Sequence, residues 1–150
     1  MSTSHIAEIL IVEDSPEDLK LALRGLSQVS LVHKIQIARD GAEALEYLFC
    51  EGSHTGRDIE NCPKVILLDL KLPKVNGLEV LQRIKCDPRT RSIPVVMLTS
   101  SREQRDVVES YSLGVNSYIV KPVNFECFVK AVKELGMYWL LLKQRPKVGG

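Results

Sequence analysis

The sequence predicts an α/β fold with a doubly wound parallel sheet, and three observations support this prediction. Five short apolar runs of strand type recur along the chain, at residues 8–12, 34–38, 64–68, 94–98 and 117–120. A longer segment with helical periodicity follows each run, and turn or helix-breaking residues separate the two kinds of segment. Such alternation places parallel strands in one sheet with helices on both of its faces.

The helical segments carry apolar residues spaced three or four positions apart. Ser15 is a good N-cap for the first helix, and Pro16 suits its first turn. Asp40 is expected to cap a second helix over residues 41–49. Further helices are expected over residues 77–86, where Asp87 and Pro88 end the pattern, over residues 103–113, and from Phe125 onward.

Composition indicates one globular domain over residues 1–150, with terminal tails at 1–7 and 143–150. Twenty Lys and Arg oppose nineteen Asp and Glu, and a net charge of +1 gives no signal for nucleic acid or acidic membranes. No apolar run of about twenty residues could cross a bilayer. The N-terminus lacks a basic start and an apolar core, so we expect no secretory signal and a cytoplasmic protein.

The four cysteines do not form a metal-binding pattern. None stands in a C-x-x-C pair, and no histidine lies at zinc-finger spacing from them. We expect reduced, partly buried thiols, and a regulatory disulfide between Cys50 and Cys62 is the alternative. These two residues bracket a polar stretch, residues 50–63, which is long for a loop and is either mobile or part of an interface.

Chemically active side chains follow four of the five strands. In open α/β sheets the functional crevice lies beyond the carboxyl ends of the strands. The residues expected there are Glu13, Asp14, Asp69, Thr99, Ser100 and Lys121, with Pro122 directly after the lysine.

These groups favour a divalent cation beside a reactive carboxylate. Three clustered carboxylates need a counter-charge, and carboxylate oxygens suit Mg²⁺, which binds few protein ligands together with waters and phosphate oxygens. With such an ion Asp69 could act as a nucleophile toward a phosphoryl group. Lys121 would pair with Asp69 before the reaction, and Thr99 would donate to a phosphoryl oxygen. The alternative for Asp69 is a strand-end carboxylate that accepts hydrogen bonds from local backbone N–H groups.

Four motifs in the right order resemble those of the receiver domains of bacterial two-component systems. They are IVEDSPED, DLKLPKVNG, LTSS and YIVKP, and the resemblance covers residues 9–142. It implies a flavodoxin-like fold with strand order 2-1-3-4-5 and phosphorylation of Asp69. It also implies a Mg²⁺ site formed by Asp14, Asp69 and the backbone carbonyl of Lys71, with Glu13 acting through water.

The resemblance also assigns roles around the acceptor. Thr99 and Tyr118 match the pair that switches position on phosphorylation, although a half-buried strand tyrosine would explain Tyr118 as well. Ser100 departs from the Ala or Gly that many receivers have directly after this threonine, but it is still small, and access to the phosphate matters at this position. Lys71 and Ser101 occupy the positions that tune hydrolysis, and neither orients a water, so we expect slow self-hydrolysis. A phosphatase would need a general acid where Lys71 stands, so the chain is expected to catalyse only its own phosphorylation and dephosphorylation.

The apolar pattern of the last helix indicates an interaction with a second chain. Phe125, Phe128, Val132, Leu135 and Trp139 form a core stripe, and the following MYWLLL run makes the helix apolar all round. We expect a homodimer through this region, because only one side can face the sheet. Burial beneath residues 50–63 is the alternative. The candidate interface residues are Phe128, Tyr138, Trp139, Leu141 and Leu142.

A narrower resemblance indicates the input. The single-domain length, the polar stretch before the third strand and the aromatic C-terminal run are similar to the small response regulators of cyanobacterial phytochromes. The implied partner is a sensor histidine kinase, a phytochrome, and no DNA-binding domain is expected. The alternative is a receiver-fold interaction module that works without phosphorylation, and the complete acidic set argues against it.

Overall fold

The computed structural model describes residues 8–28, 34–56, 62–101, 104 and 114–137 of the 150-residue chain. Within these residues five parallel strands form one sheet in the order β2-β1-β3-β4-β5, as expected. The strands are β1 (Glu8–Val12), β2 (Lys34–Ala38), β3 (Val65–Asp69), β4 (Val95–Thr99) and β5 (Ser117–Val120). Every residue of β3 and β4 is buried, which explains their continuous apolar runs.

Two of these strands begin and end one residue later than the sequence indicated. The ladder continues because Asp69 pairs with Leu98, and the N–H of Leu70 donates to the Leu98 carbonyl at 3.0 Å. The N–H of Lys121 similarly donates to the Thr99 carbonyl at 2.8 Å. Asp69 and Thr99 are therefore the last residues of their strands, and the ladder holds their backbones rigidly.

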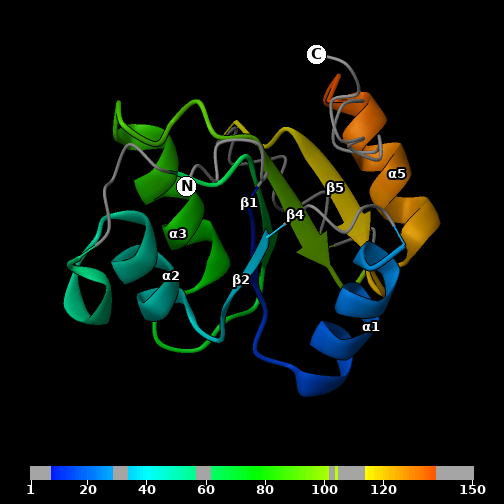
Figure 1. Ribbon diagram of the computed structural model, residues 1–150, viewed down its shortest axis with the longest axis horizontal. Helices are drawn as coiled ribbons and strands as arrows, with labels where there is room; N and C mark the ends of the chain where they lie inside the picture. The colour runs from blue at the N-terminus through cyan, green and yellow to red at the C-terminus, as the bar shows by residue number, and fades with distance from the viewer. Residues whose placement is uncertain (1–7, 29–33, 57–61, 102–103, 105–113, 138–150) are drawn as a thin grey trace, which may run out of the picture.

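Helices cover both faces of the sheet (Figure 1). α1 (Pro16–Leu26) and α5 (Phe125–Glu134) lie on one face, and α2 (Gly41–Leu48) and α3 (Gly77–Cys86) lie on the other. Alternate strand residues supply the two cores, so that Ile9 and Ile11 face α1 and α5 while Leu10 and Val12 face α2 and α3. The helix expected at 103–113 lies outside the described residues except for Gln104.

Side-chain caps begin all four of these helices and fix the loops at the carboxyl ends of the strands. Ser15 and Asp40 cap α1 and α2 as predicted, accepting hydrogen bonds from the N–H groups of residues 18 and 43. Asn76 and Asn124 do the same for α3 and α5. Each cap contributes roughly 1 kcal/mol, and each lies a few residues after a strand that ends at the same edge of the sheet.

The residues expected in a dimer interface need one correction. Phe128 lies in the core between the sheet and α1 with none of its surface exposed, so it cannot form an interface with a second chain. Its alternative position, in the core stripe of the last helix, is confirmed. The spacing of Phe128 and Val132 places both on the face of α5 that meets the sheet. The other four candidates, Tyr138, Trp139, Leu141 and Leu142, lie outside the described residues.

The described part of the polar stretch 50–63 contains a short 3-10 helix, η1 (Gly52–His54). The imidazole of His54 packs edge-on against the Tyr47 ring of α2 at 5.1 Å between centroids. Cys50 and Cys62 are both half-buried and neither forms a disulfide, so the disulfide alternative is not present in the structure. Within the described parts of the chain, every helix is too short or too polar to traverse a bilayer.

Candidate active site at the carboxyl ends of the strands

Three carboxylates from two neighbouring strands meet at one point. Val12 of β1 pairs with Leu68 of β3, so the residues that follow them emerge at the same level of the sheet. One carboxylate oxygen from each of Glu13, Asp14 and Asp69 lies within 4.8 Å of the others. Glu13 and Asp69 are buried, whereas Asp14 is exposed to solvent. The convergence expected from the sequence is therefore present.

Lys121 joins this cluster from β5 and makes three ion pairs. Its Nζ lies 3.1 Å from Oδ2 of Asp69, which is the pair expected from the sequence, and 3.2 Å from Oε1 of Glu13. The third partner is Asp18, whose Oδ2 is only 2.9 Å away. All three N–H bonds of the ammonium therefore have a carboxylate acceptor. The peptide bond between Lys121 and Pro122 is cis.

Asp18 is the residue that sequence reasoning missed. It lies in the first turn of α1, three residues after the N-cap Ser15, where an acidic residue is ordinarily explained by the helix dipole. Asp18 lies four residues after Asp14, in the helical turn that begins at the edge of the crevice. This position could have indicated that its side chain lies near the acidic cluster. The partner, Lys121, lies 103 residues away in the chain, and no local pattern identifies it.

Burial and neighbouring charges shift the pKa values of Glu13 and Lys121 in this cluster. Burial raises the pKa of Glu13 to about 7, helped by its hydrogen bond to Asp69 and the charge of that carboxylate. The Ser15 N–H and Lys121 oppose the shift. Burial lowers the pKa of Lys121, but the hydrogen bond to Asp18 and the charges of Asp69 and Glu13 outweigh it and hold the pKa above its ordinary value. The ammonium therefore stays charged.

This donor set fits a hard divalent cation. Among the described residues, the Lys121 ammonium faces three carboxylates, those of Glu13, Asp18 and Asp69, and Asp14 lies beside them. The raised pKa of Glu13 shows that this carboxylate lacks positive charge around it, which a cation would supply. All the ligand atoms are carboxylate oxygens, and the exposure of Asp14 leaves room for coordinated waters. Glu13, Asp14 and Asp69 would hold such an ion. Lys71 is exposed, and its N–H donates to Oδ1 of Asp69 at 3.3 Å.

Thr99 reaches the same edge from β4 with an unsatisfied hydroxyl. The residue is fully buried, and among the described residues its Oγ1 has no hydrogen-bond partner. Burying a hydroxyl without a partner costs about 1–3 kcal/mol. An oxygen atom of a bound group that accepts a hydrogen bond from this hydroxyl would remove that cost. Ser100 is exposed, and its N–H donates to Oε1 of Gln104 at 2.7 Å. Tyr118 is half-buried and packs against the core beneath α2 and α3.

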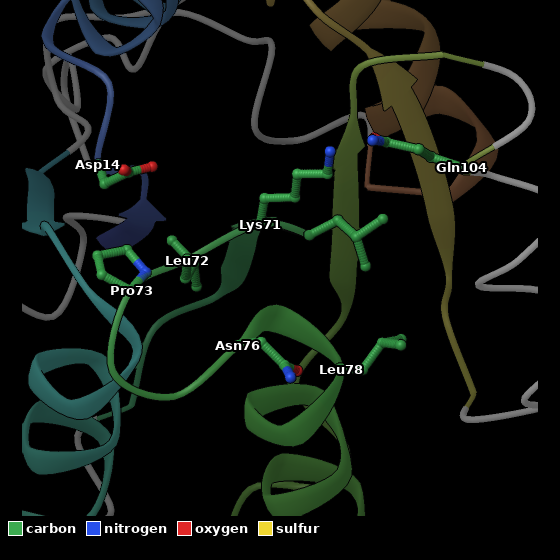
Figure 2. Close-up of a pocket in the computed structure, with 8 residues that line it drawn as sticks. Asp14, Lys71, Leu72, Pro73, Asn76, Leu78 and Gln104 are labelled. Atoms are coloured by element: carbon green, nitrogen blue, oxygen red, sulfur yellow. The ribbon is translucent and has the colours of Figure 1, made fainter.

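An open groove of about 610 Å³ adjoins the acidic cluster. Figure 2 shows the loop between β3 and α3 running through the middle of this region, with Asp14 and Gln104 at opposite sides. The residues that line the groove are Asp14, Leu70, Lys71, Leu72, Pro73, Asn76, Leu78 and Gln104. A group from another molecule can therefore reach Asp14 and the loop that follows Asp69 over a largely apolar surface.

Gly77 allows this loop to close tightly behind the acceptor. Its N–H donates to the carbonyl of Leu70 at 3.0 Å. A Cβ at this position would lie 2.3 Å from the carbonyl oxygen of Asp69 and 2.7 Å from that of Leu70. Only glycine fits, which gives a physical reason for the glycine eight residues after Asp69.

The family model of the response regulator receiver domain matches residues 9–133, which include the acidic cluster and, apart from Glu8, all five strands. The chain belongs to this family. The receiver is 43% identical to the probable methanogenesis regulatory protein FilR2 of Methanothrix harundinacea, over 92% of this chain and 86% of that protein. It is 42% identical to the response regulator Rcp1 of Synechocystis sp., over 88% of each chain.

Solved structures give the same result for the receiver. The bacteriophytochrome response regulator RtBRR is 55% identical with a TM-score of 0.86, over 94% of this chain and 84% of that one. The phosphorylated cyanobacterial phytochrome response regulator RcpA is 40% identical with a TM-score of 0.72, over 89% and 94%. The Mn²⁺-bound form of Rcp1 is 39% identical with a TM-score of 0.72, over 94% and 99%. Two of these three relatives are therefore phytochrome response regulators.

Proposed function

We propose that this receiver accepts a phosphoryl group on Asp69 from a sensor histidine kinase, in the presence of Mg²⁺, and signals by a change in conformation or association. The observation that carries the proposal is the position of the Asp69 carboxylate. It is buried at the end of β3, 3.1 Å from the Lys121 ammonium and beside two further carboxylates. The receiver would turn over no external substrate and would act in the cytoplasm.

The proposed step is one nucleophilic displacement at phosphorus. A carboxylate oxygen of Asp69 bonds to phosphorus as the phosphorus–nitrogen bond of the donor histidine breaks, and the imidazole nitrogen keeps the electron pair. Bound Mg²⁺ would neutralise charge on the transferring group and help to orient it. The groove lined by Asp14, Leu70 and Lys71 would receive the donor beside Asp69.

Two side chains of the receiver are placed to stabilise the phosphorylated state. When Oδ2 of Asp69 takes the phosphoryl group as an acyl phosphate, the Lys121 N–H that donated to this oxygen can donate to a phosphoryl oxygen. The Thr99 hydroxyl, which has no partner among the described residues, can donate to another. Formation of the acyl phosphate would therefore satisfy one group that is unpaired before the reaction.

The similarity to phytochrome response regulators supports the choice of input. RtBRR is a bacteriophytochrome response regulator, and the RcpA structure is that of a phosphorylated cyanobacterial phytochrome response regulator. The manganese in the Rcp1 structure supports a divalent cation. FilR2, a probable methanogenesis regulator, is as similar to this receiver as Rcp1 is, at 43% and 42% identity. The choice of kinase therefore rests on the RtBRR and RcpA structures. We infer that the donor is a phytochrome histidine kinase.

The test is transfer of phosphate to Asp69. The receiver is incubated with Mg²⁺ and either acetyl phosphate or a phosphorylated phytochrome kinase, and its intact mass is measured. We expect one added phosphate on the wild type and none on Asp69→Asn. Equal modification of the two proteins, or no modification of either, would contradict the proposal. Partner binding that is unaffected by phosphate would instead favour a phosphorylation-independent interaction module.

We further propose that the receiver forms a homodimer through its C-terminal region. The support is the apolar run Met137 to Leu142, which is longer than one face of a helix can bury. The candidate residues are now Tyr138, Trp139, Leu141 and Leu142. Molar mass in solution, measured with and without beryllofluoride and Mg²⁺, tests this. A monomer under both conditions would show that the run is covered within one chain.

A further inference from the structure

We propose that Asp18 is a positioning residue for phosphoryl transfer, which holds the Lys121 ammonium in place while that ammonium passes from Asp69 to the incoming phosphoryl group. This inference rests on the proposed function of Asp69. It assigns a role to a helix residue that none of the four sequence motifs identified as functional.

The first support is that the Lys121 ammonium donates hydrogen bonds to three different carboxylates. Lys121 is 13% exposed, and its Nζ donates to Asp18 at 2.9 Å, to Asp69 at 3.1 Å and to Glu13 at 3.2 Å. An ammonium has three N–H bonds, and all three are used here. Any new acceptor must therefore replace one of these carboxylates.

The second support is that, of these three partners, Asp18 alone neither belongs to the cluster that would hold the cation nor takes the phosphoryl group. Glu13 and Asp69 belong, with Asp14, to the cluster that would hold the cation, and Asp69 also takes the phosphoryl group. Asp18 is not part of that cluster. Among the described partners of Lys121, Asp18 is thus the one whose hydrogen bond can remain unchanged before, during and after the transfer.

The consequence is a short movement for Lys121. The N–H that points at Asp69 can turn to a phosphoryl oxygen bound to that same residue while the bond to Asp18 stays intact. Without Asp18 the partners of the ammonium within the described part of the chain would be Glu13 and Asp69. The ammonium would then be less well placed for the transferring group, and small misplacements of such groups are costly.

The third support is that packing fixes the distance between α1 and Lys121. Asp18 is held at the start of α1, where its own N–H donates to the Ser15 hydroxyl at 3.3 Å. Farther along, Gly25 of α1 lies directly against the backbone of Asn124 and Phe125, where an added Cβ would be 3.0 Å from both. Those residues follow Lys121 closely in the chain, so the helix and the lysine are seated together.

A purely structural reading treats the contact as a partly exposed ion pair, since the Asp18 side chain is 32% exposed. Such a pair adds little to stability and nothing to the chemistry. The two readings differ in what Asp18→Asn does to the rate of phosphorylation. Glu17→Gln is the matched control, because Glu17 is exposed, lies in the same helical turn and loses the same charge.

The experiment measures the rate of phosphorylation by acetyl phosphate at saturating Mg²⁺ over a range of donor concentrations. For Asp18→Asn we expect the maximal rate to fall about tenfold relative to Glu17→Gln, with the half-saturating donor concentration unchanged within about twofold. Asp18→Ser serves as a second variant, judged by the same criteria. A maximal rate within about twofold of the control would overturn the role of Asp18, as would a loss confined to donor affinity.

A spectroscopic measurement separates positioning from general damage to the fold. The ammonium of Lys121, with three acceptors, should give a resolved ¹H–¹⁵N signal in wild type and in Glu17→Gln, and that signal should broaden in Asp18→Asn. An unchanged signal would contradict the inference. Asp69→Asn is the control for the proposed function. If wild type takes phosphate and Asp69→Asn does not, a normal rate in Asp18→Asn would contradict the role of Asp18 alone. If wild type takes no phosphate, the proposed function itself fails.

Discussion

The Nζ of Lys121 lies 3.1 Å from Oδ2 of Asp69, although 52 residues separate the two in the chain. This pair connects the end of the central strand β3 to the end of the edge strand β5, with β4 between them. It explains how a carboxylate can lie at the rim of a fully buried strand. The same pair makes the stability of the site depend on the Lys121 ammonium.

Lys121→Met should destabilise the receiver and make its stability more dependent on Mg²⁺. The substitution leaves Glu13, Asp18 and Asp69 near one another without the ammonium between them. Removing one partner of a buried pair costs up to about 3–5 kcal/mol, and the partial exposure of Asp18 reduces this to about 2 kcal/mol. Urea unfolding with EDTA and with Mg²⁺ measures both effects. Equal stabilisation of wild type and variant by Mg²⁺ would show that the metal and the lysine do not share the carboxylates.

Two buried threonines allow a matched test of the free hydroxyl. Thr99 has no partner for its Oγ1 among the described residues, whereas Oγ1 of Thr90 donates to the carbonyl of Ile84 at 2.7 Å. Both side chains are fully buried. Thr99→Val should be neutral or stabilising by up to about 1 kcal/mol, and Thr90→Val should cost about 1–2 kcal/mol.

The same two variants should differ in the opposite sense when a phosphoryl mimic is bound. Beryllofluoride with Mg²⁺ should raise the unfolding temperature of wild type and of Thr90→Val by similar amounts. Thr99→Val should show a clearly smaller increase, because it lacks the hydroxyl that donates to the mimic. Thermal unfolding with and without beryllofluoride is the measurement. An equal increase in all three proteins would remove Thr99 from the site.

Gly77→Ala should impair both stability and phosphorylation. The new Cβ would overlap the carbonyl oxygens of Asp69 and Leu70, so the loop must move and carry the acceptor with it. We expect a loss of about 1–3 kcal/mol in unfolding free energy and slower modification by acetyl phosphate. Gly56→Ala is the control, because a Cβ at Gly56 meets nothing within 4 Å. Wild-type rates in Gly77→Ala would mean that the loop yields without moving Asp69.

Asp87, beyond the end of α3, provides a pH-dependent prediction away from the site. Hydrogen bonds from the Arg89 side chain and backbone lower the pKa of Asp87 to about 2. Because the folded-state pKa lies below the ordinary value of 3.8, the stability from this pair is complete above about pH 4 and is lost as the pH falls toward 2. Arg89→Gln should return the NMR titration midpoint of Asp87 toward its ordinary value. An unchanged midpoint would show that other groups cause the shift.

The order of the elements and the position of the site could be predicted because their causes are local or topological. Ser15 and Asp40 begin helices through hydrogen bonds that span three residues. Parallel strands bring their carboxyl ends to one edge, so Glu13, Asp69 and Lys121 meet wherever such a sheet forms. The one-residue shifts of β3 and β4 were not predictable, since they depend on which neighbouring carbonyl accepts the last ladder hydrogen bond.

By itself the sequence determined the sheet, the helix starts and the group of side chains at the acidic edge, because apolar periodicity and short-range caps act within a few residues. The tertiary structure alone decided that Asp18 shares Lys121 with Asp69 and that Phe128 lies in the core and not in an interface. Both facts depend on how α1 and α5 pack together against one face of the sheet. That packing joins residues more than a hundred positions apart, and no local pattern encodes it.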